Sequence, residues 1–369
     1  GETYDVLVPS DYMIERLIKE EYLQALDWKK IPNSKNLLPE VQNKDYDPGN
    51  RYSCPYFWGT VGILYNKNVV SQEDLDKEGW NILCDEKYKG DLYMYDSERD
   101  SFMIALKALG YSMNTKNLDE IQQAYEWLIR QRDTMDPIYA GDDVIDNMIS
   151  GNKAMAVVYS GDASYIISEN PELGYYTPQQ GTNTWYDAMV ITKDCNEVDL
   201  AHEFINFMLD DENALSNTEE VGYTSTVKSA FEEMKSGTYE GISSYIPQID
   251  NPKNEIFGYQ KPKIKQKFAE LWTKVKAKYQ DVRERHEGGS MKSKKAAAIM
   301  LCAVLGTSMI TGVSVSAKDK DELVLYTWDG MFPQEVLDDF EKETGTKVVY
   351  SNFDTDETML EKLSQAKGG

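Results

Sequence analysis

Apolar and polar positions alternate along most of the chain in a way that predicts strands followed by helices. The segment 4–8 (YDVLV) is a short apolar run that ends at Pro9, which is typical of a buried strand. Ser10 and Asp11 precede a segment with apolar residues at helical spacing, which predicts a capped helix over 12–23. Further strands are predicted at 60–65, 90–95, 153–159, 185–192, 322–327 and 346–351, and the longer helices at 99–109, 118–132, 142–149, 163–169, 198–209, 211–218, 227–235, 264–279, 334–343 and 355–366.

This pattern sets the expected fold class. A strand that leads through a short turn into a helix is the unit of a parallel sheet, so the alternation predicts an α/β fold. A chain of 369 residues is long enough for about two domains. Two segments lack the alternation. Residues 27–50 are polar and rich in Pro and Asn, which predicts a surface loop, and residues 281–290 show no periodicity, which predicts a tail and linker.

An apolar tract occupies residues 291–317. It begins with Met291 and three lysines, continues as an apolar run over 296–315, and ends with Val315 and Ala317 at spacing suited to a cleavage site. A positive start, an apolar centre and a small-residue end are typical of a secretory signal peptide. A transmembrane helix, which needs roughly 20 apolar residues, and a buried core helix are the alternatives. Gly, Ser and Thr dilute the second half of the tract, which favours the signal peptide.

The position of this tract predicts that the chain order is a circular permutation. A signal peptide belongs at the start of a nascent chain, so the unpermuted protein would begin at Met291, run to Gly369 and continue at Gly1. The seams would be the glycine-rich residues 288–290 and the join of Gly369 to Gly1. The alternation of strands and helices continues across that join without a break, which also favours a permuted order.

Composition narrows the classes of ligand. The formal net charge is −24, and the chain contains 25 Tyr and 7 Trp. Such a charge disfavours nucleic acid, which rewards basic surfaces, and suits a cationic ligand, although it can also serve solubility alone. Four Cys without metal spacing and two distant His give no basis for a metal centre or a His-based triad, so no cofactor is expected.

The predicted strand ends carry the candidate chemistry. At each of five ends a carboxylate lies beside an aromatic residue, a combination that would pair with an ammonium group and cover an alkyl chain. At any one end, the acid could instead cap a helix and the aromatic residue could belong to the core. Their recurrence favours a shared ligand site. These ends are Trp328-Asp329, Ser10-Asp11-Tyr12, Asp96-Ser97 with Asp100 beside Tyr95, Tyr159 to Asp162, and Trp185-Tyr186-Asp187.

No catalytic motif accompanies these residues. The chain has no nucleophile elbow, glycine-rich phosphate loop, HExxH or CxxC sequence. An enzyme, such as a hydrolase that uses Asp187, stays an alternative, as does a structural or membrane-anchored protein held by residues 296–315. The sequence favours a binding protein over both.

Eight short segments, read in the permuted order, carry a family resemblance. They are LYTW (325–328), FEKETGTKV (340–348), ETM (357–359), YDVLVPS (4–10), PYFWGT (55–60), ALKALGYS (105–112), Trp185-x-Asp187 and VGYTS (221–225). On these segments the chain resembles the spermidine/putrescine-binding proteins of ABC polyamine importers. The resemblance covers nearly the whole chain apart from the tail and the apolar tract.

The resemblance implies a periplasmic-binding-protein-like type II fold, here circularly permuted, with two lobes that close on the ligand at a hinge. We expect lobe 1 to comprise residues 1–62, 188–236 and 318–369, and lobe 2 to comprise residues 63–187 and 237–280. It further implies an exported, monomeric, non-catalytic receptor on the periplasmic or extracellular face of the membrane. Its partners would be a polyamine and the permease subunits of an ABC transporter, with no nucleic acid. Another organic cation, such as a quaternary amine, is the alternative ligand.

The family's ligand site can be carried over by position. The WxD motif places Trp185 and Asp187 in the site, and the Asp of this motif grips an amine in the family. The remaining positions that match are Trp328, Tyr12 with Ser10 beside it, Asp100, Tyr223 and Gln260.

The chain also departs from the family pattern. Met331 stands where a Tyr is common, Ser97 where an Asp is common, and Tyr159 where a Trp stacks on the ligand. Asp11 and Asp162 stand where smaller neutral residues are usual, which would restore the charge lost at Ser97. The resemblance therefore implies a polyamine but leaves open which polyamine is preferred.

Overall fold

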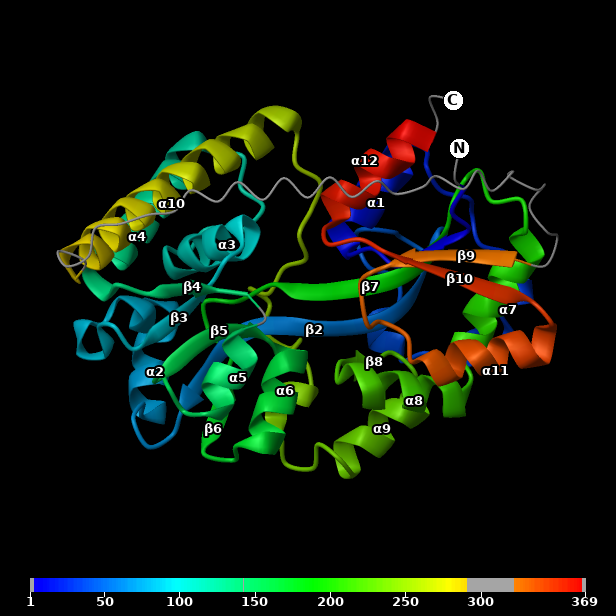
Figure 1. Cartoon of the computed structure of the whole chain (residues 1–369), viewed down its shortest axis with the longest axis horizontal. Helices are drawn as coiled ribbons and strands as arrows, with labels where there is room; N and C mark the ends of the chain where they lie inside the picture. Colours follow the sequence, from blue (N-terminus) through cyan, green and yellow to red (C-terminus); the bar gives the residue numbers. More distant parts are fainter. Residues whose placement is uncertain (1–2, 142, 291–321, 367–369) are drawn as a thin grey trace, which may run out of the picture.

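In the computed structural model the chain forms two lobes, each a β-sheet covered by helices, and two long central strands join them (Figure 1). The structure describes residues 3–141, 143–290 and 322–366. The joining strands are β2 (Ser53–Asn66) and β7 (Thr184–Ile191). This mixed α/β architecture with two lobes is the predicted fold class.

Lobe 1 is built on the sheet that contains the first half of β2. Its strand order is β10-β9-β1-β7-β2, and a short strand, β8 (Thr224–Ser225), also pairs with β2. β9 (Glu322–Thr327) pairs in parallel with both β10 (Lys347–Asn352) and β1 (Val6–Leu7). β7 runs antiparallel to β1 and β2.

Lobe 2 is built on the second half of β2. There β2 pairs with β5 (Met155–Tyr159) and β6 (Leu173–Tyr176). β3 (Leu92–Tyr95) lies between β5 and β4 (Ile138–Ala140) and is parallel to both.

The strand β2 is longer than the predicted strand at 60–65 because its first half is also buried. Residues Ser53 to Thr60 pair with β7, and residues Val61 to Tyr65 pair with β5. The partner therefore changes at the junction of the lobes. An unbroken apolar run gives no period that marks a strand, and Pro55 in this run obscured it further, since proline removes a ladder donor.

The helices follow the predicted alternation closely. α1 (Asp11–Lys19) and α12 (Asp356–Ala366) cover one side of the lobe 1 sheet, and α3 (Glu98–Ala108) begins on the side of lobe 2 that faces them (Figure 1). The other helices of lobe 1 are α7 (Val198–Met208), α8 (Asp211–Val221), α9 (Lys228–Ser236) and α11 (Gln334–Thr344), and those of lobe 2 are α2 (Gln72–Glu78), α4 (Leu118–Met135), α5 (Val144–Ile149), α6 (Ser160–Glu169) and α10 (Pro262–Ser290).

Two segments differ from the predictions. The loop at 27–50 contains three short 3₁₀ helices, Trp28–Lys30, Pro32–Asn36 and Pro39–Val41. α10 continues through residues 281–290, so the predicted tail is helical. The Glu and Arg residues of segment 281–290 are good helix formers, which explains why a segment without apolar periodicity extends the helix.

The core lies between the sheets and their helices. One large cluster runs through both lobes and includes Phe57 of β2, Met189 of β7 and Phe340 of α11. A second cluster packs α1 and α12 against the lobe 1 sheet, with Leu17 and Leu363 among its members. A third cluster fills lobe 2 between β5 and α6.

The predicted signal-like tract at 291–317 lies outside the described residues. Among the helices that the structure describes, none is long and apolar enough to cross a membrane.

Candidate functional site

The WxD motif lies on the central strand β7, at the junction of the lobes. Trp185 and Asp187 are two residues apart, so they lie on the same face of the strand. They are 8% and 6% exposed, respectively. Ser10, at the start of α1, forms a β-bridge with Asp187, and its hydroxyl donates a hydrogen bond of 2.9 Å to the Asp187 carboxylate. The lobe 1 turn is thereby fixed to the strand that carries the motif.

Ser10 differs in one respect from its predicted behaviour. It is the N-cap residue of α1, but its side chain makes no capping hydrogen bond. The hydroxyl binds Asp187 instead. The serine at this helix start therefore joins α1 to β7 rather than capping its own helix.

Two aromatic residues, one from each lobe, pack against the indole of Trp185. The ring centroids of Tyr223 and Tyr159 lie 5.3 and 6.0 Å from it, both edge-on. The Tyr159 hydroxyl donates a hydrogen bond of 2.8 Å to Asp100, which lies near the start of α3. The structure therefore brings four predicted residues, Tyr159, Trp185, Tyr223 and Asp100, into one connected group, which we call the aromatic group.

Two glycines make this packing sterically feasible. Gly59 pairs with Trp185 across the sheet, and a Cβ at Gly59 would overlap the indole. A Cβ at Gly161, in the first turn of α6, would overlap the ring of Tyr223. Because Tyr223 belongs to lobe 1 and Gly161 to lobe 2, this close approach is a contact between the lobes.

Three buried aspartates form the second part of the site. Asp11, Asp187 and Asp356 are 1%, 6% and 0% exposed, respectively. Asp11 and Asp356 each interact electrostatically with Asp187. We call them the carboxylate group. Asp11 is held by backbone N–H groups, since it accepts hydrogen bonds of 2.6 Å from Tyr12 and 2.9 Å from Tyr186. These bonds give Asp11 a structural function, which joins α1 to β7.

Burial strongly affects the ionisation of these carboxyls. It raises the pKa of Asp187 to about 7, against the opposing hydrogen bond from Ser10. It raises the pKa of Asp356 to about 8, and the nearby charge of Asp187 acts in the same direction. Burial also raises the pKa of Asp11 and of Asp100. Arg99 lowers the pKa of Asp11, Asp100 and Asp356 only in part, and no cation among the described residues acts on Asp187, so a cation beside these carboxyls would favour their charged form.

An arginine from lobe 2 lies beside the carboxylate group. The guanidinium of Arg99 lies 3.4 Å from the ring centroid of Tyr12, in cation–π geometry, and 3.2 Å from the carboxylate of Glu357. Lys265 of α10 lies 3.3 Å from the same carboxylate. The start of α12 in lobe 1 is thus bound to two cations of lobe 2.

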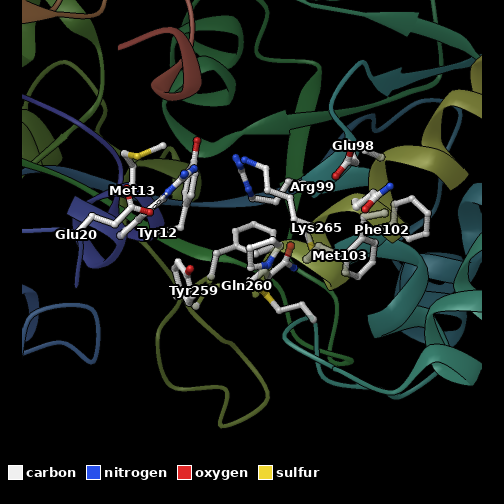
Figure 2. Close-up of a pocket in the computed structure, with 18 residues that line it drawn as sticks. Tyr12, Met13, Glu20, Glu98, Arg99, Phe102, Met103, Tyr259, Gln260 and Lys265 are labelled. Atoms are coloured by element: carbon white, nitrogen blue, oxygen red, sulfur yellow. Dashed lines mark hydrogen bonds and ion pairs between the residues drawn. The ribbon is translucent and has the colours of Figure 1, made fainter. Parts of the chain in front are cut away.

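A cavity of about 600 Å³ lies between α1, α3 and the segment that leads into α10. Figure 2 shows Tyr12 and Met13 on one side of it, Arg99 and Lys265 above, and Tyr259 and Gln260 below. Of the predicted site residues, Tyr12 and Gln260 line this cavity. The walls combine aromatic and apolar side chains with charges of both signs, as is usual for a site for a small molecule.

Besides Ser10, which binds Asp187, and Tyr12 and Gln260, which line the cavity, four predicted residues belong to neither group. Ser97 caps α3 by accepting a hydrogen bond of 3.3 Å from the N–H of Asp100. Met331 is 5% exposed in the core, where its carbonyl accepts a bond from Tyr56. Trp328 packs edge-on against Phe353. Asp162 lies near Tyr175 on the lobe 2 side.

Sequence reasoning missed three residues of this region. Asp356 and Glu357 are in the first turn of α12, and the preference of helix starts for acids explained them without a site. Arg99 looked like an ordinary residue of the first turn of α3. The available signal was the position of Glu357 in the ETM segment of the family resemblance, because Asp356 directly precedes it.

The region combines acidic and aromatic side chains from both lobes. Within the ranges that the structure describes, no three His, Cys, Asp or Glu residues are placed to hold a metal ion. The site instead offers buried carboxylates and aromatic faces at the junction of two lobes. Such side chains can hold a ligand that is both cationic and partly apolar.

Comparison with known proteins gives the class. The family of bacterial extracellular solute-binding proteins matches residues 1–242. The chain belongs to this family.

Particular relatives refine this assignment. The chain is 32% identical over 220 residues to the spermidine/putrescine-binding periplasmic protein of Salmonella typhimurium, a match that covers 60% of this chain and 62% of the relative. It is 31% identical over 251 residues to the spermidine/putrescine-binding periplasmic protein 1 of Haemophilus influenzae, which covers 68% and 69%. The matched part thus spans about three fifths of the first of these relatives.

A solved structure agrees in fold. The chain resembles the crystal structure of the spermidine/putrescine ABC transporter substrate-binding protein PotD from Streptococcus pneumoniae, determined in complex with calcium and HEPES. The TM-score is 0.66 at 36% sequence identity, and the match covers 76% of this chain and 85% of that one.

Proposed function

We propose that this chain is a non-catalytic receptor that captures a polyamine of the spermidine/putrescine class between its two lobes. It would deliver this ligand to the permease of an ABC transporter. The observation that carries the proposal is the set of buried carboxylates beside the aromatic group, with pKa values of about 7 for Asp187 and about 8 for Asp356.

The chemistry of a polyamine matches both parts of this site. Its ammonium groups supply the counter-charge that the buried carboxylates lack, and such pairing offsets the cost of removing both partners from water. Its methylene segments can lie against the rings of Tyr159, Trp185 and Tyr223. Aromatic faces add a cation–π contribution of roughly 0.5–2 kcal/mol for each well-placed ring.

The relatives support the same ligand class and cellular context. Their names describe spermidine/putrescine-binding periplasmic proteins, and the solved structure belongs to an ABC transporter. We infer that this protein acts outside the cytoplasm as a monomer and carries ligand to permease subunits. The net charge of −24 would attract a cationic ligand over long range.

Isothermal titration calorimetry with spermidine, spermine, putrescine and cadaverine tests the proposal. We expect saturable binding of at least one polyamine. A matching thermal shift should follow, since ligand at 100 times its Kd adds about 2.7 kcal/mol of stability. Choline and glycine betaine serve as quaternary-amine controls. Binding of these compounds alone would replace the polyamine by another organic cation, and no binding by a folded chain would refute the proposal.

We further propose that the chain order is circularly permuted. The support is the parallel pairing of β1 with β9, which places Val6 beside Leu325 in one sheet. A chain reordered to start at Lys318, continue from Gly369 to Gly1 and end at residue 290 should bind the same polyamine with the same affinity. A reordered chain that unfolds, or that loses binding while the original retains it, would contradict the permutation.

A further inference from the structure

Asp356 differs from every other buried aspartate that the structure describes. It is 0% exposed, and neither carboxylate oxygen has a hydrogen-bond partner among the described residues. The other buried aspartates all accept at least one hydrogen bond. Asp5 accepts one from the backbone of β9, and Asp47 accepts several in the loop before β2. Asp11, Asp100 and Asp187 accept the bonds described above.

An unpaired buried carboxylate requires an explanation, because it forgoes its hydration without compensation. The start of α12 supplies part of one, since the helix dipole favours an acid there. That effect applies equally to an exposed acid and does not account for complete burial. The two oxygens therefore represent unused acceptor capacity within the protein.

The neighbours of Asp356 do not use this capacity. The Tyr12 hydroxyl lies close enough to this carboxyl to lower its pKa, but the two groups do not reach the geometry of an ordinary hydrogen bond. The nearest cation, Arg99, is committed to the ring of Tyr12 and to Glu357. The other acidic neighbours, Asp187 and Glu357, repel it. Asp356 thus adds a second carboxylate close enough to Asp187 for the two to repel each other.

Two neighbouring carboxylates, Asp187 and Asp356, can both be bound by a cationic group that has several N–H donors. A primary ammonium has three donors and can serve two carboxylates at once, whereas a quaternary ammonium has none. Asp100 lies beside Tyr159 in lobe 2 and is not among the electrostatic neighbours of Asp187 or Asp356. The charges are therefore divided between two separate ends of the site.

We propose that Asp356 is a specificity-determining residue that binds, together with Asp187, one primary ammonium end of the polyamine. This inference rests on the proposed function and adds the residue and the amine chemistry at one end of the ligand. It makes the site selective for a terminal –NH₃⁺ over a methylated amine, with Asp100 available to a second cationic centre.

The test is calorimetry on the full chain and its Asp356→Asn variant. Asparagine keeps the size of the side chain and removes the charge. We expect the variant to bind spermidine about 10- to 100-fold more weakly, the range for a hydrogen bond to a charged group. Asp354→Asn is the matched control on the same loop, because Asp354 is exposed, and it should keep the affinity within about twofold of the original.

A second ligand separates a binding role from a structural one. A spermidine analogue with trimethylated ends should bind the unaltered chain more weakly, and Asp356→Asn should reduce its affinity less than that of spermidine. The ligand-free variant should melt at the same or a higher temperature, because an unpaired buried charge has been removed. Equal affinity of variant and original for spermidine, or an equal loss with both ligands, would overturn the inference. If the unaltered chain binds no polyamine, the proposed function itself has failed.

Discussion

The guanidinium of Arg99 lies 3.2 Å from the carboxylate of Glu357, and this ion pair joins lobe 2 to lobe 1. Lys265 adds a second cation to the same carboxylate. Both contacts connect helices that belong to different lobes, so they can form only when the lobes are close together. The pair therefore helps to hold the two lobes in the arrangement that the structure shows.

We expect both Glu357→Gln and Arg99→Gln to weaken polyamine binding by about two- to fivefold at low salt. The side chains of Arg99 and Glu357 are 33% and 41% exposed, respectively, and partly exposed ion pairs contribute roughly 0.2–1 kcal/mol. The two substitutions change the net charge in opposite directions, so a simple field effect on a cationic ligand would give opposite shifts in Kd. Calorimetry at two salt concentrations measures the Kd for the polyamine in each variant. Asp74→Asn, which breaks a pair within lobe 2, is the control. Opposite shifts would contradict the role in closure.

Gly161→Ala should impair closure without harming the ligand-free fold. The added Cβ would overlap the ring of Tyr223 across the lobe junction, while alanine in the first turn of α6 favours the helix. We expect the affinity for spermidine to fall at least tenfold, with an unchanged or raised melting temperature of the ligand-free protein. Gly141→Ala, where the Cβ meets open space, should leave both quantities unaltered. A variant with normal affinity would show that Tyr223 moves freely.

Asp187→Asn should reduce polyamine affinity more than Ser10→Ala does. Asp187 supplies a charge, and loss of one partner of a buried charge pair costs roughly 2–5 kcal/mol, a factor of about 30 to several thousand in Kd. Ser10 supplies only the hydroxyl that orients this carboxylate over 2.9 Å, so its removal should cost about tenfold or less. Calorimetry on both variants gives the order, and the reverse order would count against Asp187 as an amine ligand.

Stability and ligand binding should depend on pH in opposite ways. Burial raises the pKa of Asp187 to about 7 and of Asp356 to about 8, above the value of about 3.9 in an unfolded chain. Between about pH 4 and 8 the folded state therefore binds more protons than the unfolded state, and these groups lower stability as pH rises. A polyamine supplies the missing counter-charge, so its thermal shift should be larger at pH 8 than at pH 6.

Melting curves at both pH values, with and without spermidine, measure this difference. In an Asp187→Asn, Asp356→Asn double variant the ligand-free melting temperature should decline less from pH 6 to pH 8. An identical decline in the variant and the original would mean that other groups set the pH dependence.

The sequence predicted most elements because local pattern and tertiary burial agree in them. The strand Glu322–Thr327 has the predicted bounds, and the helix Gln334–Thr344 differs from its predicted range by one residue. The strand predicted at 185–192 is also present, as β7 (Thr184–Ile191), and it carries Trp185 and Asp187. The features that the sequence did not predict depend on tertiary contacts. The acid at Asp11 is indistinguishable by sequence from that at Asp356, yet backbone donors satisfy the first and nothing among the described residues satisfies the second. Nor could any local pattern reveal that Arg99 lies on Tyr12.

The pairing of Val6 with Leu325 affects how the chain folds while it is being synthesised. Roughly 300 residues separate these partners, and a ribosome that adds about 5–20 residues per second needs roughly 15–60 s to pass from one to the other. During that interval the edge of β1 that β9 will cover has no partner strand in this sheet, and an open strand edge is a template for aggregation. Lobe 1 should therefore be the last part of the protein to fold, and the part that most needs a chaperone while the chain is being made.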